Sequence, residues 1–590
     1  MQNAVAFSDN DVTVVAWSYG HKLEGCMGFA VYRIDAKGVE TALPSMAVFP
    51  GFVRKSGQTT ASFPIQKFYW KDPYARLVAE KTGKRKFRYK VVPLAGVPGQ
   101  LLPMTIGFVV SNEVEIGPDV GAHWRAFFNR GLISTQRVSR ALGGKPAKAG
   151  LLAAVGTKGS ALRTSLAGDM IAALLDFVKR SAAGGKLYAA LYELGDDELI
   201  AALEASGKKL HLVLSNPTAS DRQSASGLTD GNAASRKRLA LTAGELVDRM
   251  LPNNQIGHNK FVVHVDAKGK AAAVLFGSTN WTSTGLCAQT NNTIVCEEPR
   301  IAARYLAYWK ALAKDTRAAA GVAKALQGAP LRTWDAKARS FALEAGAKAT
   351  SWFSPNTPAL RSSSTTKETR PPDMEQVAQL IAGAKQAVLF LAFFPGTPSV
   401  ANWAAAAQKA NKGLFVRGCV THPSAAEAFY YELHGITPAK RKPGDPPARQ
   451  DPRVIQAEAL DATVPAGSAK EILNAGFAVT HDKIVVVDPF SADCAVVTGS
   501  HNLGHKASFN NDENLIIVRG QRKLAEAYAT HVLDIYDHFS WRWTVQTQGQ
   551  AKADAMLEVE PDVWQSRYFD AQGRIKVAQL RFWLSALPAP

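Results

Sequence analysis

The chain is poor in cysteine and has no long apolar run. Its 590 residues include five cysteines, none of them in a Cys-x-x-Cys pair. This excludes a disulfide framework or a cysteine-ligated zinc site and favours a reducing compartment. No stretch of about 18 apolar residues occurs, so no membrane-spanning helix is expected. The first residues lack the basic and apolar regions of a signal peptide, which predicts a cytoplasmic protein that attaches peripherally to a membrane if it meets one.

Acidic residues are also under-represented. The chain has 69 Lys and Arg but only 50 Asp and Glu, which gives a formal net charge of +19. Such a balance favours polyanionic partners, either nucleic acid or an anionic membrane surface, and does not choose between them. With 46% hydrophobic and 20% charged residues the composition is that of a globular protein. The length predicts roughly two to four domains.

One stretch of the sequence occurs twice. Each copy has a His, a Lys two positions later, an Asp after an apolar run, a Gly-Ser-x-Asn and a later Asn. In both copies eleven positions separate the Asp from the Gly, and twelve separate the two Asn. Two matched intervals indicate an internal duplication. Its members are His258, Lys260, Asp266, Gly277, Ser278, Asn280 and Asn292 in the first copy and His481, Lys483, Asp488, Gly499, Ser500, Asn502 and Asn514 in the second.

Each copy predicts two buried strands joined by a turn, because short β-branched runs are bounded by Pro, Asp, Ser and Gly. Residues i and i+2 of a strand share a face, so the His and the Lys of each copy point the same way. Two copies facing each other supply two imidazoles, two ammonium groups, two hydroxyls and two amides. This set suits a tetrahedral phosphate. Cations and amides bind its oxygens, one imidazole attacks, and the other protonates the leaving oxygen.

The duplicated motif resembles the HxKx4D…GSxN signature of the phospholipase D superfamily. HDKIVVVD with GSHN fits the signature, HNK with GSTN is its partner, and the resemblance covers Gly150 to Arg542. It implies a phosphodiesterase that forms one site from two halves, works through a phosphohistidine and needs no metal or other cofactor. The His, Lys and Asn of both motifs are its implied catalytic residues. The first copy has one extra residue before Asp266, which predicts a local bulge.

The two halves differ at the residue that should orient each histidine. Counted back from the matching Asn, Glu513 of the second copy aligns with Asn291 of the first. A carboxylate beside His481 favours a protonated ring, and an amide beside His258 does not. We therefore expect His258 to be the nucleophile and His481 the general acid. The residues expected to bind substrate are Ser278, Ser500 and Asn291, and those expected in supporting roles are Asp266 and Asp488.

Three segments are expected within an α/β fold. Residues 1–116 contain short β-rich runs between turn residues, which predicts an all-β sandwich similar to a fibronectin type III domain. Residues 117–345 and 346–590 alternate strand and helix patterns, so each predicts a phospholipase D-like half with a central mixed sheet flanked by helices. Polar insertions at 216–254 and 421–480 precede the two catalytic histidines and are candidate substrate loops. The basic run Lys81 to Lys90 is interpreted as a solvated hairpin rather than a phosphate contact.

Three functions remain open from the sequence. The first is a phosphodiesterase that hydrolyses a phospholipid or transfers its phosphatidyl group to an alcohol, with Phe393, Phe394 and Pro395 as a candidate apolar rim. The second is a nuclease, which the net charge and the basic insertions favour. The third is a non-catalytic phosphate-binding adaptor, and the intact motifs argue against it. Because one chain carries both motifs, we expect a monomer with an intramolecular pseudo-dimer.

Overall fold

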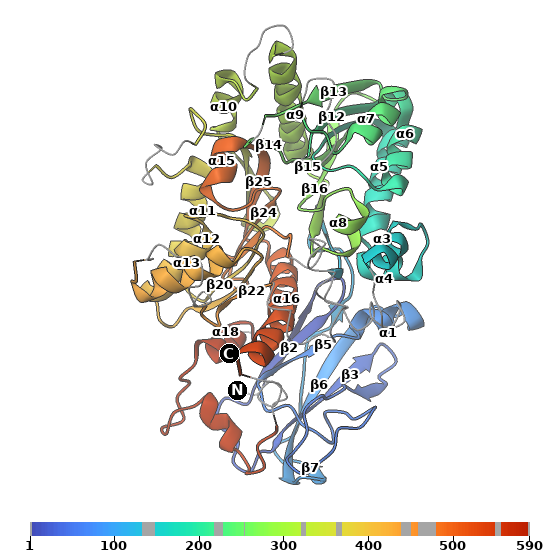
Figure 1. The fold of residues 1–590 in the computed structure, drawn as a ribbon. Coiled ribbons are helices and arrows are strands. Elements are labelled where there is room, and N and C mark those ends of the chain that lie inside the picture. The colour runs from blue at the N-terminus through green and yellow to red at the C-terminus, as the bar shows by residue number, and fades with distance from the viewer. Residues whose placement is uncertain are drawn as a thin grey trace.

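The computed structural model (Figure 1) describes residues 3–131, 148–217, 228–252, 254–319, 326–361, 369–437, 450–457, 480–548 and 556–587. Two mixed sheets with their helices form the larger part of the molecule. In Figure 1 the first half (green) and the second half (yellow to orange) stand side by side, and the N-terminal part (blue) lies below them. The predicted α/β class is confirmed.

Helices cover both faces of the sheet of the first half. Two strand pairs, β11 with β12 and β12 with β13, are parallel, and the remaining pairs are antiparallel. The helices include α5 (Met170–Gly184), α6 (Asp197–Ser206), α7 (Ala233–Ala240) and α9 (Pro299–Ala319). The strands, in spatial order, are β10 (Trp124–Phe128), β17 (Asn292–Cys296), β16 (Ala271–Gly277), β15 (Lys260–Asp266), β11 (Gly185–Leu191), β12 (Leu210–Ser215) and β13 (Glu245–Arg249).

The sheet of the second half repeats this order, which confirms the duplication. Its helices include α11 (Pro372–Ala382), α12 (Val400–Ala410), α13 (Pro423–His434), α15 (His505–Asn510) and α16 (Arg522–Gln548). The short strand β14 (Ile256–Gly257) of the first half pairs with β25 and so joins this sheet. The other strands, in spatial order, are β18 (Arg339–Ala342), β19 (Lys348–Ser354), β25 (Asn511–Arg519), β24 (Ala495–Gly499), β23 (Ile484–Val487), β20 (Ala387–Ala392), β21 (Phe415–Val420) and β22 (Val454–Gln456).

The strands that carry the motifs form where the sequence predicts them. β20 and β23 are apolar throughout and entirely buried, as expected for central strands covered on both faces. The extra residue of the first motif is absorbed as predicted, since the pairing of β15 with β16 shifts between His264 and Val265. This bulge leaves the start of β15 in register with its counterpart in the second half.

The N-terminal segment contains two antiparallel sheets, in agreement with the predicted β-rich class. One sheet has the order β1 (Asn3–Ser8), β2 (Thr13–Ser18), β5 (Tyr69–Asp72). The other contains β4 (Glu40–Ala42), β3 (Gly28–Asp35), β6 (Lys86–Val97) and β7 (Gln100–Pro103), with β8 (Val109–Val110) and β9 (Val114–Glu115) paired to β6.

The prediction that this segment is entirely β was wrong in one place. Helix α1 (Ala75–Thr82) lies within it, built from Ala, Leu, Glu and Lys and ended by Gly83 at a φ of +68°. The basic run therefore begins on a helix and continues along β6. Its side chains form ion pairs, Lys84 with Asp35 and Lys90 with Glu40, as expected for a solvated edge.

The C-terminal tail, residues 556–587, packs against both the N-terminal sheets and the second half, where Phe582 stacks on Phe415 of β21. Trp564, Tyr568 and Leu580 share a buried cluster with Trp17 and Phe29. The tail contains helix α18 (Ala578–Ser585).

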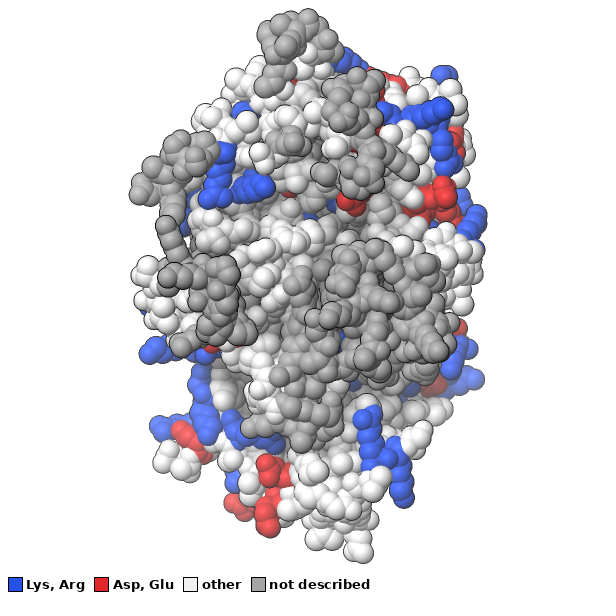
Figure 2. Space-filling model, in the orientation of Figure 1, with Lys and Arg blue, Asp and Glu red and all other residues white. Residues whose placement is uncertain are grey.

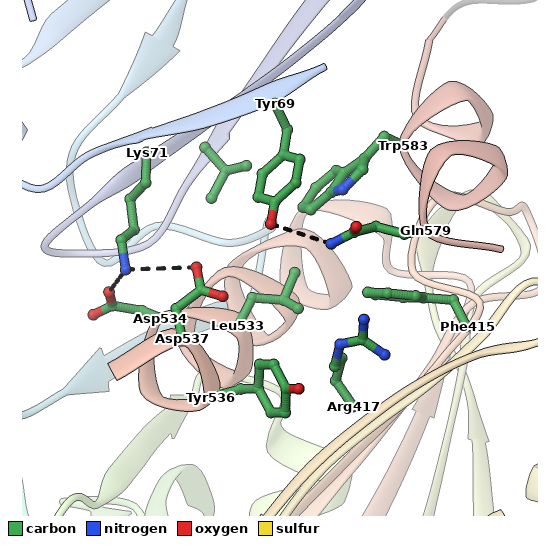
Figure 3. A pocket seen from close by; sticks show the side chains of 11 residues that line it. Tyr69, Lys71, Phe415, Arg417, Leu533, Asp534, Tyr536, Asp537, Gln579 and Trp583 are labelled. Carbon is green, nitrogen blue, oxygen red and sulfur yellow. Dashed lines mark hydrogen bonds and ion pairs between the residues drawn. The ribbon is translucent and has the colours of Figure 1, made fainter. Parts of the chain in front are cut away.

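The same tail fixes the N-terminal segment to the second half (Figure 3). Trp583 of α18 stacks on Tyr69 of β5 with ring centroids 4.6 Å apart, and Gln579 donates to the Tyr69 hydroxyl at 3.1 Å. Lys71 of β5 forms ion pairs with Asp534 and Asp537 of α16. β5 is thus tied to both C-terminal helices.

The two insertions are less loop-like than predicted. The first contains α7 and β13, and its basic residues are paired: Arg236 with Asp230 and Asp248, Arg238 with Glu204. The second contains α13 and β22, while its Pro- and Lys-rich segment at 438–449 lies outside the described residues. Among the helices that the structure describes, none is both long and apolar enough to cross a membrane.

Candidate active site

The two motifs meet in a cleft of about 490 Å³ between the halves. The cleft lies where β11 and β20 end, beside the starts of β15 and β23. Both motif histidines line it, and their rings are 6.3 Å apart between centroids. Other residues of the cleft wall are Tyr192, Glu193, Asn280, Phe393, Phe394, His422, Asn502 and Lys506.

Each histidine is held through its backbone by the opposite half. The amide of His258 donates to the carbonyl of Asp512 at 2.9 Å, and the amide of His481 donates to the carbonyl of Thr290 at 3.0 Å. Both side chains are nearly inaccessible, with 4% and 3% of their surface exposed. The cleft therefore depends on both halves for its geometry.

The ring partners are exchanged between the halves, which corrects the sequence interpretation. Glu513 lies beside His258, with Oε2 at 2.9 Å from Nδ1, and Asn291 lies beside His481, with Oδ1 at 2.8 Å from Nδ1. The prediction had each partner serving the histidine of its own copy. It failed because the chain just before β17 and at the start of β25 runs along the boundary between the halves, where Thr290 and Asp512 accept from the amides of the opposite histidines.

The hydrogen bonds fix the tautomer of both rings. His258 Nδ1 also lies 3.1 Å from the carbonyl oxygen of Ser500, and since that oxygen can only accept, Nδ1 carries the hydrogen. Asn291 donates its Nδ2 to the carbonyl of Gly285, so its Oδ1 faces His481 and accepts from that ring. In both neutral rings Nε2 is left as the nucleophilic or basic atom.

The two motif serines lie behind the ring partners and do not line the cleft. Ser278 donates to Asn291 Oδ1 at 2.9 Å, and Ser500 donates to Glu513 Oε2 at 2.7 Å. Both are fully buried. The predicted substrate-binding role of the serines is therefore replaced by a positioning role, and Asn291 acts on a histidine rather than on substrate.

Both motif lysines are buried beneath the histidines. Lys260 Nζ donates to the carbonyl of His258 at 2.8 Å, and Lys483 Nζ donates to that of His481 at 2.5 Å. Burial lowers the pKa of Lys260 to about 8, although Glu513 and Glu193 raise it. Burial and the neighbouring Lys260 lower the pKa of Lys483 well below its usual range.

The pKa values of the two histidines and of Glu513 are shifted in opposite directions. Burial, followed by the two lysines, lowers the pKa of His258 and of His481 well below the usual range. Burial raises the pKa of Glu513 to about 7. The resting rings are thus neutral, and a bound phosphate anion would raise the pKa of the histidines and lysines around it.

The two asparagines of the Gly-Ser-x-Asn motifs line the cleft as predicted. Asn280 donates its Nδ2 to Glu193 Oε2 at 2.6 Å. The Oδ1 atoms of Asn280 and Asn502 are buried and have no partner among the described residues. Polar atoms left in this state mark a place where a ligand supplies the missing bonds.

The two motif aspartates lie away from the cleft and support turns. Asp266 ends β15 and accepts from the amides of Lys268 and Lys270. Asp488 accepts from the amides of Lys385, Gln386 and Ala387. Both accept hydrogen bonds from backbone amides of turns, and their supporting role stays a prediction.

The sequence analysis named neither Tyr192 nor Glu193 as a site residue, because an apolar run does not show at which residue its strand ends. β11 ends at Leu191, and the next two residues enter the cleft. The Tyr192 ring meets His258 edge-on at 5.1 Å, as Phe393 meets His481 at 4.6 Å. The signal available was the position after a parallel strand, where α/β sheets place their ligands.

Comparison with known proteins points to one superfamily. Residues 377–535 match the family model described as "Cardiolipin synthase, PLD-like domain". Among solved structures, the chain is similar to phosphatidylserine synthase of Haemophilus influenzae Rd KW20 (12% identity, 66% of this chain and 92% of that chain, TM-score 0.37). It is also similar to Nuc of Salmonella typhimurium (20% identity, 32% of this chain and 95% of that chain, TM-score 0.21). A third similar structure is yeast tyrosyl-DNA phosphodiesterase (11% identity, 60% of this chain and 88% of that chain, TM-score 0.30).

The TM-scores are all below 0.5, so these likenesses do not bear on substrate. Comparison with curated proteins found no match. The family match covers residues 377–535 in the second half, and the duplicated motif extends the resemblance to the first half.

Proposed function

We propose that this chain is a phosphodiesterase that cleaves a phospholipid through a covalent phosphohistidine, with water or an alcohol as acceptor. The observation that supports this most directly is the pair of buried histidine rings, 6.3 Å apart between centroids, in one cleft. That spacing lets a phosphorus atom lie between the two Nε2 atoms. Because one chain supplies both rings, the monomer is the proposed active form, and a cytoplasmic location stays a prediction.

In the proposed first step, Nε2 of His258 attacks phosphorus and the P–O bond to the leaving group breaks. The ring gains a positive charge as the P–N bond forms, and Glu513 at 2.9 Å neutralises it through Nδ1–H. His481, protonated at Nε2, gives its proton to the leaving oxygen. Only an amide oxygen faces its Nδ1, so the proton is held less strongly than it would be beside a carboxylate.

His258 remains the proposed nucleophile, as in the sequence analysis, but for a different reason. The carboxylate of Glu513 lies beside the nucleophile and not beside the general acid. In the second step, neutral His481 takes a proton from water or an alcohol, whose oxygen attacks phosphorus and displaces His258. Lys260, Lys483 and the two motif asparagines are proposed to bind the phosphate oxygens in both steps.

An apolar edge of the cleft favours phospholipid as the substrate class. Phe393 and Phe394 pack edge-to-face at 4.2 Å, and 46% of the surface of Phe394 is exposed. They lie on the His481 side of the cleft. A nucleic acid is the second candidate because of the net charge of +19. On the face shown in Figure 2, however, the described Lys and Arg lie in separate groups with Asp and Glu among them, and a nuclease groove needs a continuous stripe.

Turnover on two substrate panels tests the proposal. One panel holds mixed phospholipid vesicles, with released head groups quantified, and the other holds labelled single- and double-stranded DNA and RNA. His258→Ala is the inactive control, and His264→Ala, a histidine outside the cleft, is the matched active control. We expect head-group release that is lost only in His258→Ala. Cleavage of nucleic acid with intact lipid would replace the phospholipid class with a nuclease.

A further inference from the structure

Each motif lysine lies over the face of an aromatic ring. Lys260 Nζ is 5.1 Å from the centre of the Tyr192 ring, and Lys483 Nζ is 5.0 Å from the centre of the Phe393 ring. The face of an aromatic ring attracts a cation within about 6 Å, and the attraction is strongest where water is excluded. Only 2% of Lys260 and 0% of Lys483 are exposed, so both contacts are shielded from water.

The two rings hold equivalent places in the two sheets. Antiparallel pairing of β11 with β15 puts Leu191 opposite Lys260, and the next residue is Tyr192. The pairing of β20 with β23 has the same register relative to its lysine, and the equivalent residue is Phe393. The contact between ring and lysine therefore recurs with the duplicated frame.

The backbone of each ring residue is held by the residue that precedes a helix. The carbonyl of Tyr192 accepts from Nδ2 of Asn232 at 2.6 Å, and Asn232 stands just before α7. The carbonyl of Phe393 accepts from the amide of His422 at 3.3 Å, and His422 stands just before α13. Different groups thus fix the two rings at the same place in each half.

The ammonium groups have few other contacts. An ammonium has three N–H donors. Among the described residues, each motif lysine donates one hydrogen bond, to the carbonyl of the histidine in its own motif. The remaining donors are left for a ligand, and a buried charge with so few hydrogen bonds needs further stabilisation while the cleft is empty.

Carboxyl groups also face the lysines, but their charge changes with pH. The titratable and charged groups around the two ammonium groups are Glu193, Glu513, Asp482, His258, His481 and, for each lysine, the other lysine. Burial raises the pKa of Glu513 to about 7 and raises that of Glu193 as well. An aromatic ring face has no proton to gain or lose in this range, so its attraction does not change with pH.

We propose that the ring faces of Tyr192 and Phe393 keep the two motif lysines in their charged form, so that the lysines can bind phosphate oxygens. This inference rests on the proposed phosphodiesterase function and adds two positioning residues to it, which act through the lysines. Phe393 has this role in addition to its place at the apolar edge of the cleft.

The pH profile of kcat/KM on a p-nitrophenyl phosphodiester tests the inference in the full chain, because kcat/KM follows the charge of the free enzyme. The ring stabilises the protonated lysine, so its removal lowers the pKa and the cation is lost at a lower pH. In Tyr192→Leu the midpoint of the alkaline limb should therefore fall by about one pH unit. Tyr192→Phe keeps the ring face, as Phe393 does in the second half, and should keep the wild-type midpoint.

Fluorinated phenylalanines at the place of Tyr192 separate the charge of the ring face from its shape. Fluorine withdraws electron density from the face and changes the size of the ring little. The midpoint should fall stepwise from phenylalanine to its monofluoro, difluoro and trifluoro forms. Calorimetric binding of sulfate, which stays a dianion between about pH 6 and 9, should weaken at the same lowered pH in these proteins.

Three results would overturn the inference. In the first, Tyr192→Leu lowers kcat/KM equally at every pH, which leaves the ring only a packing role. In the second, Tyr192→Phe shifts the midpoint as far as Tyr192→Leu, which assigns the effect to the hydroxyl. In the third, neither the midpoint nor sulfate binding follows the number of fluorines. Failure of the proposed function looks different, since then no ester is cleaved in a way that His258→Ala abolishes, and sulfate binding still tests the contact between ring and lysine.

Discussion

The two halves of the molecule share one frame and differ in the groups attached to it. Strand order, the two motif lysines and the two motif asparagines repeat, and each half orients the histidine of the other. The histidine partners are a carboxylate, Glu513, in one case and an amide, Asn291, in the other. A duplicated frame thus brings two equal rings to one cleft, and substitutions around them make the rings unequal.

The layer behind the histidines differs as well. In the second half Asp482, next to His481, accepts from Asn292 at 2.8 Å and lies 3.0 Å from His531 of α16. In the first half the equivalent residue is Asn259, which donates to the hydroxyl of Tyr308 on α9 at 3.1 Å. The second half has a buried pair of a carboxyl and an imidazole where the first has a pair of an amide and a hydroxyl. Each motif histidine therefore has one carboxylate beside its ring or directly behind it, and both carboxylates, Glu513 and Asp482, belong to the second half.

The largest expected difference between the halves concerns the histidines themselves. On a p-nitrophenyl phosphodiester, whose leaving group needs no proton, His258→Ala should lose turnover by at least about 10⁴-fold because no phosphoenzyme can form. His481→Ala should lose about 10²- to 10³-fold, because only acid–base assistance is gone, and the phosphoenzyme should accumulate. Acid-quenched enzyme digested and mapped for phosphohistidine measures this. A phosphoryl group on His481 would reverse the assignment.

Exchange of the two ring partners is expected to have the next largest effect. Glu513→Gln removes the charge that neutralises the phosphohistidine ring, and kcat should fall about 100-fold. Asn291→Asp places a carboxylate beside His481 and raises its pKa, so the ring gives up its proton less readily and kcat should fall about 10-fold. Steady-state kinetics of both variants measure the difference. Equal losses would mean that the two partners do equivalent work.

A pH profile separates the lysines from the histidines. Lys260 binds a phosphate oxygen only while it is protonated, and its pKa in the empty cleft is about 8. As the pH rises through 8 the cation is lost, so kcat/KM should fall by about 10-fold for each further pH unit. Lys260→Arg keeps its charge at all these pH values, so its kcat/KM should stay constant above pH 8, even if its activity is lower throughout. An unchanged alkaline limb in Lys260→Arg would assign the titration to another group.

The sequence predicted the frame well because the relevant signals are local. The period of two along a strand placed His258 and Lys260 on one face, and the spacing to the later glycine predicted the bulge before Asp266. Long runs such as Ala387–Ala392 could only be buried strands. These are properties of a few consecutive residues.

What the sequence did not predict depends on contacts between distant segments. Spacing within one copy aligns Glu513 with Asn291 but does not indicate which histidine either side chain faces. The return of Trp564 and Trp583 to the N-terminal sheets also has no local signal. Glu193 was missed for a third reason. The end of a strand can be predicted only to within about one or two residues, and here that difference decides whether a side chain enters the cleft.

The smallest expected effect concerns the layer behind the histidines, and it is on stability rather than chemistry. Burial lowers the pKa of His531, but Asp482 and Asp9 outweigh it, so the pKa is raised in the folded state. A raised pKa contributes stability that is complete below the unfolded value, about 6.5, and is lost as the pH rises through the folded value. Asp482→Asn should therefore lower the free energy of unfolding by about 3 kcal/mol at acidic pH and by less as the pH rises.

The first half supplies the matched control for this difference, because its equivalent pair is neutral. Tyr308→Phe removes one buried hydrogen bond, and its cost of about 1 kcal/mol should not change with pH. Urea unfolding of both variants between pH 5 and 8 compares the two slopes. If the cost of Asp482→Asn were as flat as that of Tyr308→Phe, His531 would be neutral in the folded chain. The second half would then carry no charged pair, and the halves would differ only at the cleft.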